Sequence, residues 1–145
     1  MLVLDDGAVV LESQLICEYL DSIGTGPTLY PEAGRWLWRT RMMIGHGLAE
    51  ASVALRLQQV LPEAEQSETL KDRYTGRMAR AVAALESQAD ALIPGAMRMD
   101  KICAVIGLGH MEFRHGEDWR DDAPNLAAWY DDAMERPSFA KTAMD

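Results

Sequence analysis

Glu12 and Ser13 are a polar pair at the start of a predicted helix, where they could hold a charged ligand. From Leu15 on, apolar residues recur with the spacing of one helical face, which predicts a helix that begins at Ser13. The first turn of such a helix has unpaired N–H groups and the positive end of the helix dipole, so a carboxylate or phosphate could bind at Ser13 while Glu12 receives an ammonium group. The pattern also fits an ordinary N-cap serine beside a glutamate that only complements the dipole. A ligand with both charges, such as an amino acid, would fit the first interpretation.

Metal chemistry is not expected from the three histidines, His46, His110 and His115. The sequence contains no H-E-x-x-H or C-x-x-C spacing, no Gly-rich phosphate loop and no G-x-S-x-G elbow. The two cysteines, Cys17 and Cys103, each lie in an apolar helical pattern, which favours two buried thiols in a reducing compartment over a disulfide.

The elements that must position Glu12 and Ser13 begin with a hairpin. Residues 2–4 and 8–11 are short apolar runs typical of strands, and Asp6-Gly7 between them predicts a type I′ turn, in which both central residues have positive φ. After the first helix, residues 21–34 contain three Gly and two Pro, which marks a domain boundary.

The rest of the sequence predicts helices. Residues 35–61 and 67–92 have apolar stripes at helical spacing, and the short loop between them predicts an antiparallel pair. Residues 102–111 are apolar almost all round, which indicates a helix buried on every side at the centre of the bundle. Residues 114–123 form a polar connection, and Pro124 begins a last full helix that ends before Pro137, followed by one more turn with Phe139 packed inward.

The net charge and the hydropathy of the sequence limit the kinds of partner that the protein can bind. The 145 residues carry a formal net charge of −9, which disfavours nucleic acid and anionic lipid, and no apolar stretch approaches the length of a membrane span. The start of the sequence does not have the pattern of a signal peptide, so we expect a cytoplasmic protein.

Four segments in order resemble the cytosolic glutathione transferase family of bacterial type. The matching strings are LVLDDG, VLES and ICEYLD near the start, Leu29-Tyr30-Pro31 in the linker, residues 99–114 in the central helix, and APNLAAWY with RPSF near the end. The resemblance implies a mainly α fold: an all-α C-terminal helical domain at residues 35–145, a linker at 24–34, and at 1–23 a β-hairpin plus helix that is the remnant of a thioredoxin-like, glutathione-binding domain.

The family resemblance also implies a function. In the family, the acidic residue and serine at the positions of Glu12 and Ser13 hold the γ-glutamyl end of glutathione, the co-substrate. The start of the first long helix lines the site for a small apolar electrophile, which makes Trp36, Met43 and His46 the substrate-pocket candidates. Their residue types alone favour core or dimer contacts instead. Family members commonly form homodimers through the long helix pair.

Two departures from the family pattern affect activity. The residue that activates the glutathione thiol belongs to the first part of the thioredoxin-like domain, which precedes Met1, so conjugation by this chain is expected to be lost or very weak. Met97 stands where the family has a Ser or Thr that caps the central helix. The alternative is a non-catalytic module that keeps the helical domain for dimerisation or for an apolar ligand.

Overall fold

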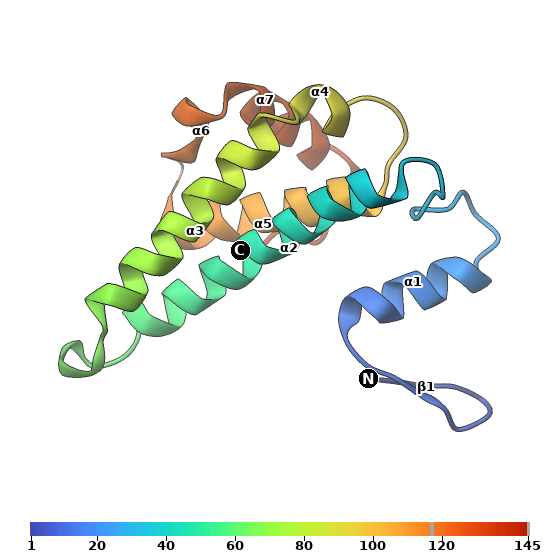
Figure 1. Cartoon of the computed structure of the whole chain (residues 1–145), viewed down its shortest axis with the longest axis horizontal. Coiled ribbons are helices and arrows are strands. Elements are labelled where there is room, and N and C mark those ends of the chain that lie inside the picture. The colour runs from blue at the N-terminus through green and yellow to red at the C-terminus, as the bar shows by residue number, and fades with distance from the viewer. Residues whose placement is uncertain (117, 145) are drawn as a thin grey trace.

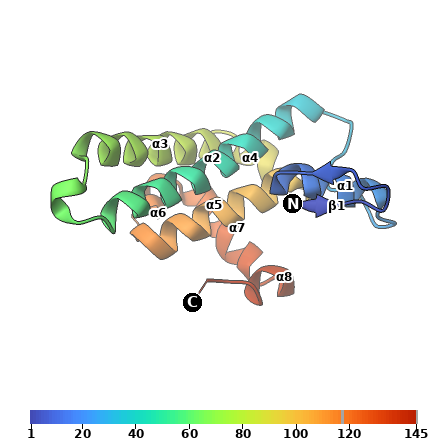
Figure 2. The same cartoon turned by 90° about the horizontal axis from the view of Figure 1, so that it is seen from below.

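The protein is a helical bundle with a hairpin and one helix attached at one end, as the computed structural model shows for residues 1–116 and 118–144 (Figure 1). The bundle holds the main apolar core, and the hairpin and α1 lie together at the end of the bundle where α2 begins (Figure 2). In chain order the elements are β1 Leu2–Val3, β2 Val9–Val10, α1 Ser13–Ile23, α2 Arg35–Gln59, η1 Glu63–Glu65, α3 Glu68–Glu86, α4 Ala89–Leu92, α5 Met99–His115, α6 Trp119–Asp122, α7 Pro124–Met134 and α8 Pro137–Ala140.

The hairpin is present, but its turn is not the predicted type I′. The strands pair antiparallel, with Leu2 opposite Val10 and Val3 opposite Val9. The Gly7 N–H donates to the Leu4 carbonyl at 2.9 Å, and Gly7 alone in the turn has positive φ, at 85°. The loop therefore has three residues with a left-handed glycine at its end, so Asp6 keeps a negative φ.

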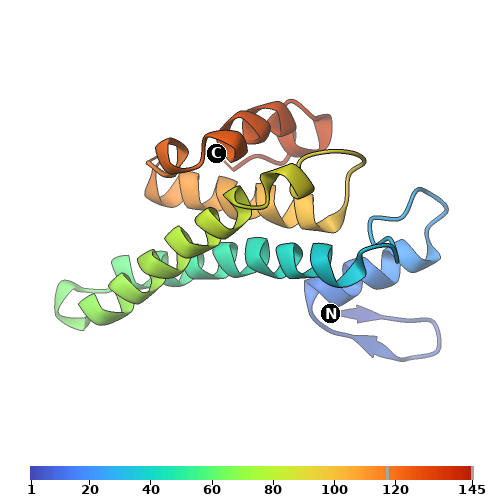
Figure 3. The same cartoon turned by 45° about the horizontal axis from the view of Figure 1, so that its top comes forward.

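Helices α2 and α5 cross at two glycines and form the centre of the bundle (Figure 3). A Cβ on Gly45 would lie 2.7 Å from the backbone nitrogen of Ala104, and a Cβ on Gly107 would lie 2.6 Å from the carbonyl oxygen of Gly45. Only glycine allows the two backbones to approach so closely. Helix α7 packs on another side of α5, which confirms α5 as the central helix, although one apolar side chain on it, Ile106, is 52% exposed and not buried as predicted.

The predicted helix over residues 67–92 is divided in two. The side chains of Ser87 and Gln88 both donate to the Ala84 carbonyl, at 2.9 and 3.0 Å. They occupy the acceptor that the Gln88 N–H would use in a continuing helix, and that N–H bonds to Leu85 instead. Helix α3 therefore ends at Glu86, and α4 is a separate turn. The predicted polar connection at residues 114–123 contains one further helical turn, α6.

Helix α5 begins without a side-chain cap among the described residues, as Met97 predicted. The linker supplies one replacement, because the Met99 N–H donates to the Leu29 carbonyl at 3.1 Å. Asp100 supplies the other: its fully buried carboxylate accepts from the Lys101 N–H at 3.1 Å and from the Arg41 guanidinium at 3.0 Å. The linker and α2 thus stabilise the start of the central helix.

The fold class is mainly α, with a two-stranded antiparallel hairpin, as predicted. The prediction of two buried thiols is half right: Cys103 is partly buried, whereas Cys17 on α1 is exposed, because α1 presents only one face to the bundle. Among the described residues, no helix is both long enough and apolar enough to cross a membrane.

Candidate functional site

The first turn of α1 is open to a ligand. Glu12 is the N-cap residue, with φ of 64° and ψ of 128°, and among the described residues no side chain caps this end. Its carbonyl accepts the Ile16 N–H at 3.0 Å, so the helix begins properly at Ser13. Ser13 is therefore the first helical residue and not the N-cap. A positive φ in a non-glycine residue is strained, and such strain is most often found where a chain must present a group to a ligand.

Side-chain contacts hold α1 against the linker and α2. Glu18 forms an ion pair with Arg39 of α2, one of whose hydrogen bonds measures 3.2 Å. Asp21 accepts the N–H of Leu29 at 2.8 Å, and the Tyr30 hydroxyl donates to the Gln14 carbonyl at 3.5 Å. Because these contacts fix α1 on both its first and last turns, Glu12 has a defined position relative to α2.

A cavity of about 750 Å³ lies between the start of α1 and the first half of α2. Glu12 and Leu15 line it from the α1 side, and Trp36 and Met43 line it from α2. The tertiary structure thus brings one of the two predicted glutathione-binding residues together with two of the three predicted substrate-pocket residues. A concave site with apolar walls and a few polar groups is the usual form of a small-molecule site.

Trp36 and Met43 are surface residues, with 73% and 50% of their area exposed. They are not core residues, because their neighbours Trp38 and Met42 are the side chains that pack inward, on a different face of the helix. His46 lies elsewhere: its Nε2 is 3.4 Å from Glu50 on the same helix, and it is outside the described lining of this cavity.

Arg39 and Thr40 also line the cavity and did not stand out in the sequence. The hydrogen bond from Arg39 to Glu18 raises the pKa of the guanidinium, and the Thr40 hydroxyl donates to the Trp36 carbonyl at 2.7 Å. The contact between Glu18 and Arg39 could not be predicted from the sequence, because a linker separates the two residues and sequence periodicity does not specify the path of a linker.

The other two histidines have structural partners between α2 and α5. His110 Nδ1 lies 2.7 Å from the hydroxyl of the buried Ser52, and His115 Nε2 lies 3.0 Å from the Ser52 carbonyl. Burial, and then the nearby charge of Arg114, lower the pKa of His110. Within the described part of the chain, no three His, Cys, Asp or Glu side chains are grouped to hold a metal ion.

Comparison with known proteins relates the whole chain to glutathione transferases. No protein-family model matches the chain. It is 27% identical to an uncharacterised glutathione transferase-like protein of Escherichia coli K12, YibF, over 98% of this chain and 73% of that protein. A glutathione transferase of Methylobacillus flagellatus KT, solved with glutathione bound, superposes with a TM-score of 0.88 at 26% identity and covers 99% of this chain and 74% of its own.

A second solved structure is more similar in sequence. It is a glutathione transferase family member from Pseudomonas fluorescens Pf-5, solved with bound S-(propanoic acid)-glutathione. It superposes with a TM-score of 0.91 at 34% identity, over 99% of this chain and 76% of that one. The two proteins are therefore similar in sequence as well as in fold, over almost the entire length of this chain. This chain belongs to the glutathione transferase family.

Proposed function

We propose that this chain binds glutathione by its γ-glutamyl end at Glu12 and Ser13. The observation that carries the proposal is that Glu12, Trp36 and Met43 line the same cavity. It places a carboxylate at the uncapped start of α1, next to an apolar wall. The glutathione-bound relatives support glutathione as the ligand.

The first turn of α1 accounts for the direction of binding. The Ser13 hydroxyl and the N–H groups of this turn would donate to the α-carboxylate of the γ-glutamyl group, and the Glu12 carboxylate would accept from its ammonium. Such charge-assisted hydrogen bonds are about twice as strong as neutral ones. Residues 1–23 then act as the glutathione-binding part, 24–34 as the linker, and 35–145 as the helical domain.

The second substrate in this proposal is a small apolar electrophile, which contacts Leu15, Trp36 and Met43. Among the described residues that line the cavity, the one hydroxyl is that of Thr40, and its proton is already given to the Trp36 carbonyl. It therefore has no proton to donate to a glutathione thiolate. We accordingly propose that conjugation by this polypeptide is very weak, and that the alternative, a non-catalytic binding or dimerisation module, applies if glutathione also fails to bind.

An NMR titration of backbone amide shifts tests the binding proposal. Glutathione and γ-glutamyl-cysteine should shift the Glu12 and Ser13 amides with similar dissociation constants, because both carry the γ-glutamyl group, whereas cysteinyl-glycine should not. Because only one amino-acid group is contacted, we expect a dissociation constant on the order of millimolar, which corresponds to a binding free energy of about −4 kcal/mol.

Two serine variants on α1 supply the control. Ser13→Ala should weaken glutathione binding, whereas Ser22→Ala should not, because the Ser22 hydroxyl donates to the Tyr19 carbonyl at 2.6 Å near the other end of the helix. Equal glutathione shifts in the parent and in Ser13→Ala, or the same shifts with cysteinyl-glycine, would show that Ser13 does not bind the ligand.

A further inference from the structure

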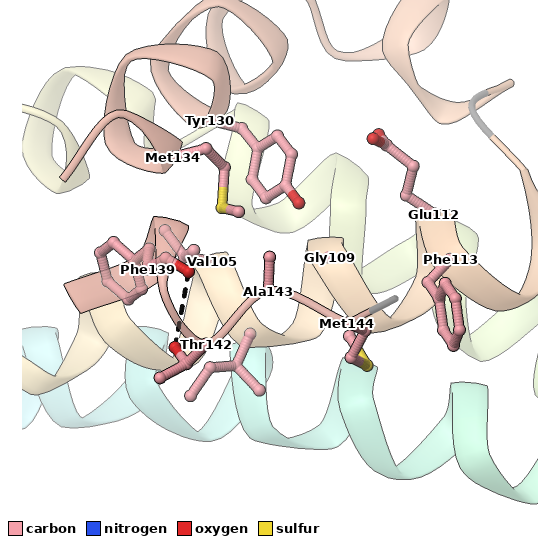
Figure 4. Close-up of a pocket in the computed structure, with 11 residues that line it drawn as sticks. Val105, Gly109, Glu112, Phe113, Tyr130, Met134, Phe139, Thr142, Ala143 and Met144 are labelled. Atoms are coloured by element: carbon pink, nitrogen blue, oxygen red, sulfur yellow. Dashed lines mark hydrogen bonds between the residues drawn. The ribbon is translucent and has the colours of Figure 1, made fainter. Parts of the chain in front are cut away.

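A second cavity, of about 520 Å³, lies between α5, α7 and the segment that follows α8 (Figure 4). Three aromatic rings line it, those of Phe113, Tyr130 and Phe139, together with Met134 and the exposed Ile106. None of these residues lines the cavity beside α1. Cavities of this volume take small organic molecules, and aromatic rings with a methionine sulfur favour a flat aromatic ligand.

Tyr130 supplies one polar group to this apolar space. Tyr130 as a whole is only 7% exposed, and its hydroxyl points into the cavity above Gly109 (Figure 4). A Cβ on Gly109 would lie 2.9 Å from this hydroxyl oxygen, so the glycine leaves the hydroxyl room. The side-chain contacts of residues 1–116 and 118–144 include no hydrogen bond to the Tyr130 hydroxyl, and its oxygen is not among the fully buried atoms that lack a partner, so it is reached from the cavity. A hydrogen-bond acceptor on a ligand in the cavity would take this proton in place of water.

The charges around the cavity favour a neutral ligand. Glu112 lines the cavity, but its carboxylate already accepts from Arg120 at 2.8 and 3.0 Å and from Trp119 at 3.1 Å. None of the described lining residues is a lysine or arginine. Of the two arginines against the lining rings, Arg120 is paired with Glu112 and Asp131, and Arg114 lies over the Phe113 ring. Burial, and then the Glu112 charge, raise the pKa of Tyr130, which keeps the hydroxyl protonated as a donor.

We propose that this cavity binds a neutral aromatic molecule with one hydrogen-bond acceptor, which receives the Tyr130 hydroxyl proton. The site is independent of the proposed glutathione site, because the two cavities share no lining residue. A ligand here would contact the central helix α5 and the segment after α8 at the same time.

Three probes of one size test the proposal on the full chain. Acetylnaphthalene carries a carbonyl acceptor, ethylnaphthalene has the same shape without an acceptor, and naphthoate is an anion. Calorimetric titration should show that acetylnaphthalene binds about fivefold more tightly than ethylnaphthalene, which is typical of one neutral hydrogen bond. Naphthoate should bind least, and amide shifts caused by acetylnaphthalene should map to Gly109 and Phe113.

Three variants distinguish the contribution of the Tyr130 hydroxyl to binding from that of the apolar cavity. Tyr130→Phe should remove the advantage of acetylnaphthalene and leave ethylnaphthalene binding unchanged. Ile106→Trp, at an exposed lining position, should abolish binding of both, whereas Leu57→Trp, at an exposed position of α2 outside the cavity, should not. Equal affinity for the two neutral probes in the parent, an advantage that survives in Tyr130→Phe, or preferred binding of naphthoate would each overturn the proposal. Glutathione titrated in parallel should still shift Glu12 and Ser13 in all three variants, so a failure of one site is distinguishable from a failure of the other.

Discussion

The crossing of α2 and α5 predicts opposite effects for the same substitution at different glycines. In Gly45→Ala the new Cβ would lie 2.7 Å from the Ala104 nitrogen and from the Cys103 carbonyl carbon, both of which are backbone atoms that cannot turn aside. Ordinary contact begins near 3.4 Å, so α2 and α5 must move apart by several tenths of an ångström. Their separation would loosen the buried leucines on both helices.

The magnitude follows from two opposing contributions. Forcing an extra methyl group into a close-packed interface costs up to about 3 kcal/mol, and alanine in a helix is about 1 kcal/mol more favourable than glycine. We therefore expect Gly45→Ala to lower the free energy of unfolding by about 2 kcal/mol, a fall of about 6 °C in Tm for a chain of this size.

Gly76→Ala in α3 is the matched control. Its Cβ would meet only the end of the flexible Arg80 side chain, at 3.1 Å. The helix-propensity gain is then unopposed, and Tm should rise by about 3 °C. Urea unfolding followed by circular dichroism gives both free energies. If Gly45→Ala proved as stable as the parent, or if both variants shifted Tm in the same direction, the close approach would not be the reason for glycine at this crossing.

Four further outcomes are expected. Asp100→Asn should destabilise the chain by about 3 kcal/mol in urea unfolding, because it leaves the buried Arg41 charge without a carboxylate; a loss below about 1 kcal/mol would contradict this. Iodoacetamide at pH 8, followed by mass spectrometry, should alkylate the exposed Cys17 and spare Cys103, because burial raises the pKa of the Cys103 thiol to about 11. Light scattering should show a dimer or larger species at micromolar concentration, since the hairpin and α2 expose apolar side chains, and a clean monomer would refute this. Conjugation of glutathione to an aryl halide should be barely measurable, because a free thiol with a pKa of about 8.5 is mostly protonated at neutral pH; turnover within tenfold of a related transferase, a margin equal to about 1.4 kcal/mol of barrier, would contradict it.

Local patterns in the sequence determined most of the elements. The helical period predicted α2, and the almost entirely apolar run at residues 102–111 predicted the middle of α5. Pro124 predicted where α7 begins, Pro137 predicted that α7 ends before it, and the residues around Glu12 and Ser13 predicted the start of α1. These predictions succeed because a helix or a turn depends on residues that are close together in the chain.

Contacts between distant segments decided the rest. Periodicity marks Trp36, Trp38, Met42 and Met43 equally as apolar helical residues. Packing against α5 and the linker determines that Trp38 and Met42 are buried, whereas Trp36 and Met43 stay exposed beside the cavity at α1. Packing also exposes Ile106, which the sequence placed in the core, because α5 is covered incompletely on that face. The period of a helix specifies which residues share a face, whereas only the tertiary arrangement specifies what each face meets.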